Sequence, residues 1–237
     1  MKTSCETKIN FSDMNQESML GFGNMIDIMQ DCMNVQSESI NRGVEYQLET
    51  RRVWVLSSWQ IEIHGHFNLN EEIVATTWPY YFKGAAGKRN SVIARKGAPD
   101  DFIIKANSVW AMFDAAKGTL SRIMQDDVAP YECEEPLDMD YIKSKIKRAD
   151  SYEKQDTFTV RNYHMDFNRH MNNAWHLRIA EEYVTDHMKV KKVRIEYKMQ
   201  AVLGDCMIAY VARESGRTVV ELRNSEDELF SITEFDY

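Results

Sequence analysis

The sequence has few cysteines and no long hydrophobic run. Its cysteines, Cys5, Cys32, Cys133 and Cys206, lie far apart without a C-x-x-C pair, so it predicts neither a disulfide framework nor a zinc site. No apolar run approaches the roughly 18–20 residues of a membrane-spanning helix, and the first residues lack the hydrophobic segment of a signal peptide. We therefore expect a cytoplasmic protein without a membrane span, a metal ion or a cofactor.

Positive charge is also scarce. The net charge is −8, which leaves no broad basic surface for phosphate groups and argues against a nucleic-acid-binding protein. The G-x-S-x-G motif of serine hydrolases is absent. The 43% hydrophobic and 28% charged residues are typical of a globular protein. A chain of 237 residues suits one large domain or two smaller ones.

A dense polar stretch near residue 170 carries the strongest chemical signal. Asp166, Asn168 and His170 alternate, so in an extended segment their carboxylate, amide and imidazole project from one face. Asn172 or Asn173 can cap a helix that follows. Free backbone N–H groups and the dipole at that helix start suit a carbonyl oxygen that gains negative charge. The pattern indicates a hydrolase site, and the alternative is an ordinary polar loop with a surface histidine.

Two segments have the apolar spacing of helices. The first, within residues 11–41, includes Met25 and Met29. The second follows the polar stretch and has apolar residues at Leu177, Ala180, Val184 and Met188, which predicts a helix that continues to about Met188.

Two meanders of strands are predicted from apolar and alternating segments. The first comprises segments 52–63, 73–78, 91–95 and 102–113, and the second comprises segments 192–202, 206–213, 218–223 and 229–235. Pro79 is expected to end the segment before it. A helix followed by a meander, present twice, predicts an α+β chain. Charge-rich residues between the meanders predict a linker, so we place the modules at 1–137 and 153–237 and the linker at 138–152.

Weak but ordered similarity between the two halves supports an internal repeat. Matches separated by 134 positions join Ile61-Glu62-Ile63 and Asn70-Glu71 to Ile195-Glu196-Tyr197 and Gly204-Asp205. At a separation of 153 positions, Asp13, Asn15 and Glu17 match Asp166, Asn168 and His170. The repeat predicts that two equivalent modules pack together and that only the second carries the imidazole.

Four motifs resemble those of the fatty acyl-ACP thioesterases, in their plant and bacterial forms. The segment from Arg52 to Trp59 looks like the family's Trp-Val-x-x-Arg strand, and the segment 75–78 looks like its Thr-Trp segment. Residues 107–114 look like its Ser-x-Trp-x-Met-x-Asn strand, and residues 166–173 are similar to its Asp-x-Asn-x-His-x-Asn-Asn motif. The resemblance covers nearly the whole chain.

This resemblance implies a fold and an activity. The fold is two tandem hotdog modules, each a long central helix wrapped by an antiparallel sheet, joined into one continuous sheet. The activity is hydrolysis of a fatty acyl thioester on acyl carrier protein in fatty acid biosynthesis. No nucleic acid is involved, and the two modules within one chain make either a monomer or a homodimer sufficient.

The resemblance also assigns roles to residues. Asp166, Asn168, His170 and Gln200 are the expected catalytic residues, with His170 as the general base because an imidazole titrates near neutrality. The residues expected to contact the substrate are Asn172, Asn173, Trp175, Met25 and Met29.

Two positions depart from the family pattern. Gln200 stands where the family usually has glutamate, and Ala201 stands where the plant enzymes have cysteine. Ala201 excludes a cysteine nucleophile there, and Gln200 can hold a water but cannot take its proton. A hotdog protein that binds an acyl thioester without cleaving it, an acyl-CoA thioesterase and a dehydratase therefore remain alternatives.

Acyl carrier protein is acidic as a family, so an acidic chain must dock it through local basic clusters. The candidate positions are Lys143, Lys145, Lys147 and Arg148 in the linker, and Lys189, Lys191, Lys192 and Arg194 before the second meander. The alternative is that both clusters are ordinary solvated surface.

Overall fold

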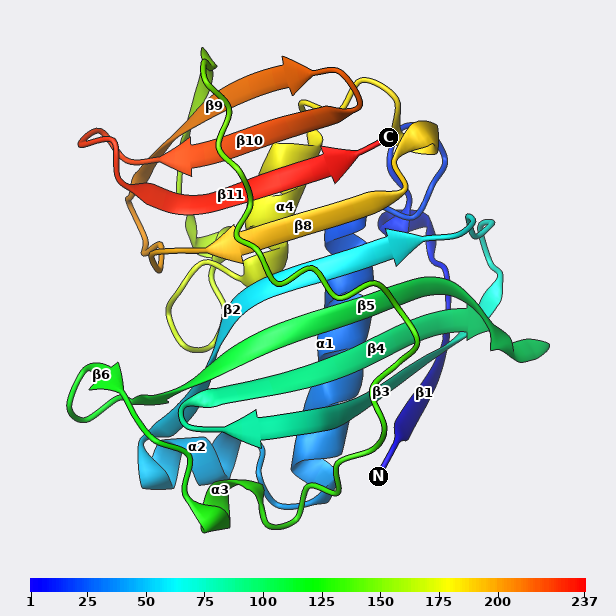
Figure 1. Cartoon of the computed structure of the whole chain (residues 1–237), viewed down its shortest axis with the longest axis vertical. Helices are drawn as coiled ribbons and strands as arrows, with labels where there is room; N and C mark the ends of the chain where they lie inside the picture. The colour runs from blue at the N-terminus through cyan, green and yellow to red at the C-terminus, as the bar shows by residue number, and fades with distance from the viewer.

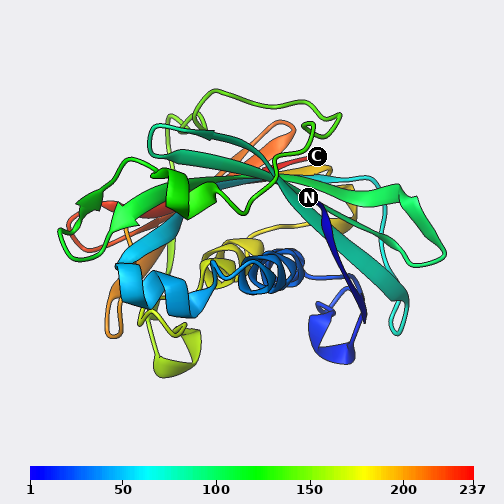
Figure 2. The same cartoon turned by 90° about the horizontal axis from the view of Figure 1, so that it is seen from below.

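A single antiparallel sheet organises the chain. The computed structural model describes residues 1–237, and its 11-stranded sheet has the order β1-β3-β4-β5-β2-β8-β11-β10-β9-β7, with β6 paired to β5 (Figure 1). Helices α1 and α4 lie side by side on one face of the sheet (Figure 2).

The elements fall into two groups along the chain. The first contains β1 (Thr3–Lys8), α1 (Phe22–Ser39), α2 (Val44–Thr50), β2 (Arg52–Ile63), β3 (Glu72–Lys83), β4 (Ala86–Arg95), β5 (Ala98–Asp114), β6 (Thr119–Leu120) and α3 (Gln125–Val128). The second contains β7 (Glu153–Thr159), α4 (Asn173–Glu181), β8 (Lys192–Tyr197), β9 (Cys206–Glu214), β10 (Arg217–Arg223) and β11 (Leu229–Asp236). Three short 3₁₀ helices occupy Phe11–Asp13, Asn162–His164 and His187–Lys189.

Strands β2 and β8 join the two groups into one sheet. They pair antiparallel from Ser58↔Glu196 to Glu62↔Lys192. The predicted separation of 134 positions is confirmed, because Ile63 pairs with β5 as Tyr197 pairs with β11. At that separation Gln60 is equivalent to Arg194, its partner in the ladder, so an approximate two-fold axis passes through this pair. The double hotdog fold in one continuous sheet is confirmed.

The helices bury their apolar faces against the sheet and against each other. On α1, Phe22, Met25, Ile26 and Met29 recur at helical spacing and are all buried. They belong to one cluster of 38 buried residues that extends through both modules. A shared core explains why neither module is closed by its own residues alone.

The second helix is shorter than expected. Rather than continuing to Met188, α4 ends at Glu181, and Met188 is 59% exposed. The N–H groups of Tyr183 and Val184 bond to carbonyls three residues earlier, which tightens and ends the helix. Both side chains still reach the core. The prediction of a long central helix therefore holds for α1 and is wrong for α4.

Strand β3 runs through Pro79 to Lys83, so the expected end at Pro79 is also wrong. The ladder to β4 is irregular between Pro79 and Tyr81. A proline that has no N–H to donate is tolerated at such an irregularity. The Pro79 carbonyl accepts a hydrogen bond from the N–H of Glu134 instead, at 3.0 Å.

The segment between the modules crosses the outer face of the sheet, opposite the helices (Figure 2). The buried amide of Gln60 donates to the carbonyl of Asp140 and accepts from the N–H of Ile142 at 3.0 Å. The N–H of Ile146 donates to Glu196 at 2.7 Å. The sheet is thus covered near its two-fold axis on both sides, which accounts for the partly apolar character of both faces of β2.

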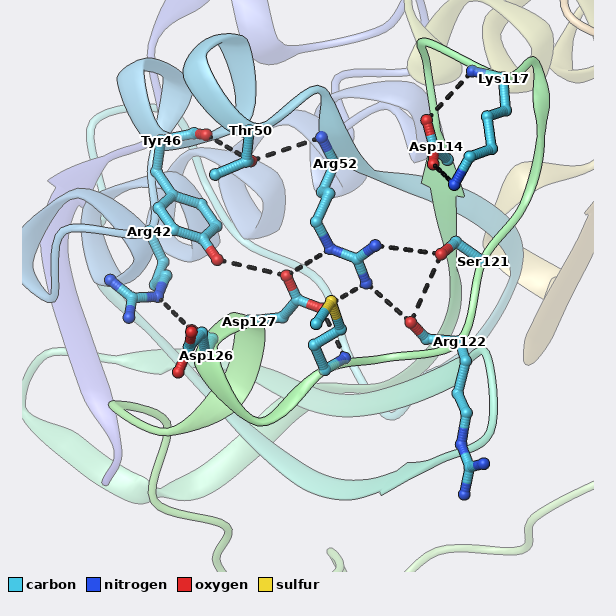
Figure 3. Close-up of polar contacts among 11 residues, drawn as sticks. Arg42, Tyr46, Thr50, Arg52, Asp114, Lys117, Ser121, Arg122, Asp126 and Asp127 are labelled. Atoms are coloured by element: carbon cyan, nitrogen blue, oxygen red, sulfur yellow. Dashed lines mark hydrogen bonds and ion pairs between the residues drawn. The ribbon is translucent and has the colours of Figure 1, made fainter.

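A buried ion pair fixes the corner formed by α2, α3 and the start of β2 (Figure 3). Asp127, 2% exposed, accepts from Arg52 Nε at 2.7 Å and Nη2 at 2.5 Å. It also accepts from the hydroxyl of Tyr46 at 3.2 Å and from the N–H of Met124 at 2.7 Å. One carboxylate therefore holds three elements together.

Candidate active site

The predicted catalytic trio lies in a tight hairpin between β7 and α4. Met165 and Met171 form an isolated antiparallel bridge, and Arg169 between them has a φ of 62°. Asp166 Oδ1 accepts hydrogen bonds from the N–H groups of Asn168 at 2.8 Å and His170 at 3.2 Å. The expected extended segment is therefore wrong, because an aspartate side chain that bonds its own backbone closes a turn.

The hairpin leads directly into α4. Asn172 is the N-cap, and its side-chain oxygen accepts from the N–H of Ala174 at 2.9 Å, as one of the two predicted caps requires. The N–H of Met171 donates to the carbonyl of Ala201 at 2.8 Å. This bond brings the segment that contains Gln200 beside the hairpin.

A cavity of about 850 Å³ opens at the start of α4. It extends from the hairpin along α1 toward α2 and the strands of the first module. Six of the predicted site residues line it: Asp166, Asn168, His170, Asn172, Asn173 and Gln200. The structure thus brings together the polar residues that the sequence singled out.

A residue of the first module, Gln30, contacts the start of α4, and this contact was not predicted from the sequence. The amide of Asn173 donates to Oε1 of Gln30 on α1 at 3.1 Å, and Gln30 also lines the cavity. The hydroxyl of Tyr197 donates to the carbonyl of Asn173 at 3.0 Å, and burial raises the pKa of Tyr197, so it remains a donor. The helical spacing of the polar residues Asp27, Gln30 and Asn34 could have predicted that this face of α1 lines a polar site.

His176, one turn into α4, is a second imidazole on the cavity wall. It is 2% exposed, and its Nδ1 lies 3.1 Å from the hydroxyl of Ser231. Burial lowers the pKa of His176 to about 4, so its ring is neutral near pH 7.

Three predicted substrate contacts do not reach the cavity. Met25 and Met29 are fully packed in the core, at 2% and 0% exposure, because they lie on the face of α1 that meets the sheet. Met33, one turn further along, lines the cavity instead. Trp175 packs against His164, with ring centroids 4.8 Å apart, and does not line the cavity.

Two arginines of the proposed basic clusters form ion pairs within the protein. Arg194 is 9% exposed and bonds Glu234 at 3.1 Å, and Arg148 pairs with Glu221 at 2.8 Å. The linker lysines are exposed, and the segment that contains them crosses the outer face of the sheet, opposite the helices (Figure 2). Burial therefore withdraws Arg194 from a docking surface, whereas Arg148, with its side chain 54% exposed, remains a candidate.

The first module has an equivalent hairpin and helix start. The bridge Met14↔Leu20 precedes Met165↔Met171 by 151 positions. The predicted separation of 153 is therefore wrong by two residues, and Met19, not Glu17, is equivalent to His170. Asn15 Oδ1 accepts from two N–H groups as Asp166 does, at 3.0 Å each. Similar residue types also align when the two hairpins are shifted by two residues, so the sequence match selected a separation of 153 instead of 151.

A carboxylate occupies this equivalent helix start. Glu181, from the end of α4, accepts from the N–H of Phe22 at 3.0 Å and of Gly23 at 3.4 Å. Burial raises the pKa of Glu181, although the two N–H groups and the nearby His187 oppose the shift. Gln30 and Glu181 are themselves 151 positions apart. Each helix therefore places the side chain at this equivalent position against the first turn of the other helix, Glu181 on backbone N–H groups and Gln30 on the side chain of Asn173.

Comparison with known proteins agrees with this geometry. Family models for the acyl-ACP thioesterase N-terminal and C-terminal domains match residues 1–131 and 147–233. A chloroplastic acyl-[acyl-carrier-protein] hydrolase of Cuphea viscosissima is 25% identical over 208 residues, which are 83% of this chain and 47% of that protein. The chain thus spans about half the length of the curated relatives it matches.

Two solved structures share the fold over almost the entire chain. One is an acyl-ACP thioesterase from Bacteroides thetaiotaomicron, with a TM-score of 0.88 and 18% identity over 99% of this chain and 97% of that one. The other is a 12:0-ACP thioesterase from Umbellularia californica, with a TM-score of 0.81 and 12% identity over 99% and 96% of the two chains. With both family domains matched in order along its length, the chain belongs to the acyl-ACP thioesterase family.

Proposed function

We propose that this protein hydrolyses fatty acyl thioesters on acyl carrier protein and releases the free fatty acid during fatty acid biosynthesis. Membership of the family supports the reaction class. The observation that carries the proposal is that His170, Asn168, Gln200 and the start of α4 line one cavity of about 850 Å³. A cavity of that size accommodates a small-molecule chain.

His170 serves as the general base in this proposal. No ion pair or hydrogen bond within the protein engages its ring, so the ring is free to take a proton from a water molecule. Asn168 and Gln200 have amides that can hold that water or the thioester carbonyl. Because Ala201 has no nucleophilic group, direct attack by water is the simplest route at this position.

The start of α4 supplies the stabilising partner for the carbonyl oxygen. Asn172 uses its side chain on the N–H of Ala174, while the N–H of Asn173 has no acceptor within the protein. An unpaired N–H in the first helical turn, together with the helix dipole, stabilises an oxygen that becomes negative during attack. Asp166 acts indirectly, by closing the hairpin that holds His170 beside this helix start.

A second candidate function is binding of an acyl thioester without cleavage. It is favoured by Gln200, since an amide at the family's glutamate position cannot exchange a proton. The two functions differ in the fate of the bound thioester.

The test measures free fatty acid and free thiol released by the purified protein from acyl-ACP and from the same acyl group on CoA. Catalytic release from acyl-ACP supports the proposal, and a preference for acyl-CoA reassigns the carrier. Stoichiometric binding of acyl-ACP, without release above the uncatalysed rate, would establish the binding function instead.

A further inference from the structure

Arg89 on β4 is a buried cation in the cavity wall with no carboxylate partner. It is 8% exposed, lines the cavity and takes part in no ion pair. Its Nη2 donates to Oε1 of Gln36, and its Nε has no hydrogen-bond acceptor. The guanidinium lies over the ring of Tyr131, 5.7 Å from its centroid.

Other buried arginines are neutralised. Arg194, 9% exposed, bonds Glu234, and Arg223, 8% exposed, bonds Glu221 with a 2.6 Å contact. Removing a guanidinium from water without an anionic partner costs free energy, and an N–H group left without an acceptor adds to that cost. Arg89 lines the cavity, and Gln36 is the one hydrogen-bond acceptor that the protein gives its guanidinium, which leaves the guanidinium with unused hydrogen-bonding capacity.

The surroundings keep the guanidinium in place. The amide of Gln36 donates to the carbonyl of Met1 at 2.8 Å and to the hydroxyl of Thr3 at 3.0 Å, so its oxygen is left to face Arg89. Ser37 and Tyr131, whose hydroxyls are 2.8 Å apart, line the same part of the cavity. The part of the cavity beside Arg89 is therefore lined by polar groups that the protein holds in place.

The position along α1 sets the reach from the catalytic hairpin. Gln30 contacts Asn173 at the start of α4, and Gln36 contacts Arg89. Six residues of helix separate these contacts, a rise of about 9 Å. A fatty acyl chain whose carbonyl lies beside His170 can thus bring its distal part, not its carbonyl, to Arg89.

We propose that Arg89 forms a polar subsite in the part of the cavity beside Gln36 and Tyr131, which binds an oxygen atom carried on the distal part of the acyl chain. The substrate class is a medium-length acyl thioester with a hydroxyl or other oxygen acceptor near its far end. The inference rests on the proposed function. Arg89 is a specificity-determining residue here and takes no part in the chemical step.

The experiment compares octanoyl, decanoyl and dodecanoyl thioesters of acyl carrier protein with their terminally hydroxylated counterparts. For at least one length, kcat/KM of the wild-type protein is expected to favour the hydroxylated chain by about tenfold, the effect of one hydrogen bond to a charged donor. Arg89→Met should abolish or invert that preference. Arg89→Lys, which keeps a cationic donor, should retain part of it.

Arg223→Met is the matched control, because it removes another buried arginine but lies outside the cavity. This substitution should leave the ratio of kcat/KM for hydroxylated and unsubstituted chains unchanged, even if it lowers the melting temperature. Binding of non-hydrolysable acyl amides, measured by calorimetry with the same variants, gives the ratio independently of turnover. A protein that cleaves no thioester would overturn the proposed function, whereas the amides would still decide the role of Arg89. Equal or weaker binding of every hydroxylated chain, unaltered by Arg89→Met, would overturn the subsite.

Discussion

The two helix starts are built alike but are occupied differently. At α1, the carboxylate of Glu181 accepts from the N–H groups of Phe22 and Gly23. At α4, the equivalent neighbour is Gln30, which bonds the side chain of Asn173, and the N–H of Asn173, a residue that lines the cavity, has no acceptor within the protein. The occupied start shows that this geometry attracts an anionic oxygen. By equivalence, the open start is where a thioester carbonyl would develop its charge.

The largest expected effect tests the residue that distinguishes the open site. His170→Ala should reduce kcat by about 10²–10⁴, the usual contribution of a general base, with little change in KM. Steady-state kinetics on acyl-ACP measure both parameters. Met19→Ala, at the equivalent position, should alter stability without changing the chemical step. Near-normal turnover of His170→Ala, or an acyl-enzyme trapped on any residue, would contradict water attack assisted by His170.

A second test concerns the corner at which α2 and α3 meet the start of β2, because only the first module contains α2 and α3. Asp127→Ala should lower the free energy of unfolding by about 3–5 kcal/mol, because it leaves the guanidinium of Arg52 buried without its partner. Denaturant titration measures the change. Asp126→Ala, an exposed neighbour, is the control and should be nearly neutral. A small loss at Asp127 would show that the corner is held by packing instead of by this ion pair.

The neutral imidazole of His176 should make stability depend on pH. Its pKa falls from 6.5 to about 4 on folding, so between these values the unfolded chain binds the proton and the folded chain does not. Stability should therefore decrease as pH falls through this window, by about 3 kcal/mol from this group. Unfolding measured across the window, with His176→Gln as the comparison, isolates the contribution. Parallel pH profiles for the two proteins would disprove it.

Equivalent substitutions at the two helix starts should have different consequences. Glu181→Ala should cost about 1–3 kcal/mol of stability, because it leaves the N–H groups of Phe22 and Gly23 buried and unpaired. Gln30→Ala should change stability much less but lower kcat/KM by up to about tenfold, the value of one hydrogen bond. Melting curves and kinetics on both variants test this. Equal effects on stability and activity would mean that the starts are not functionally distinct.

The smallest effect is expected in the hairpins. Asn15 in the first module accepts the same pair of backbone bonds as Asp166 does in the second. Asp166→Asn should therefore change stability by less than about 1 kcal/mol and leave kcat within a few-fold, whereas Asp166→Ala should loosen the hairpin. Steady-state kinetics of Asp166→Asn and Asp166→Ala separate the contribution of the negative charge from that of the hairpin geometry. A collapse of activity in Asp166→Asn would assign the carboxylate a direct role.

The strands and the repeat were predictable because their signals are local. The alternation within β2 and the 134-position match of Ile61 and Ile195 follow from which face of one sheet each residue occupies. The hairpin at residues 165–171 was not predictable from alternation, since one side chain, Asp166, bonds its own backbone and overrides the extended form. Edge strands β1 and β7 were missed because most of their residues are exposed and lack apolar spacing.

The candidate site was predictable only where it is continuous in sequence. Residues 166–173 form one motif, and folding keeps them together at the cavity. Gln30 and Arg89 come from α1 and β4, and only the packing of the two modules brings them into the same cavity. The methionines of α1 could not be sorted by sequence, because Met25, Met29 and Met33 share helical spacing but only Met33 faces the cavity.

The ladder between β2 and β8 has one further consequence. A dimer of identical hotdog chains presents the same residues at both helix starts, so a carboxylate that closes one start closes the other. In this protein the ladder lies between two halves of one polypeptide, and residues 30 and 181 can change separately. Because both halves belong to one polypeptide, the first can keep a carboxylate at its helix start while the second, under the proposed function, leaves its helix start open to the substrate.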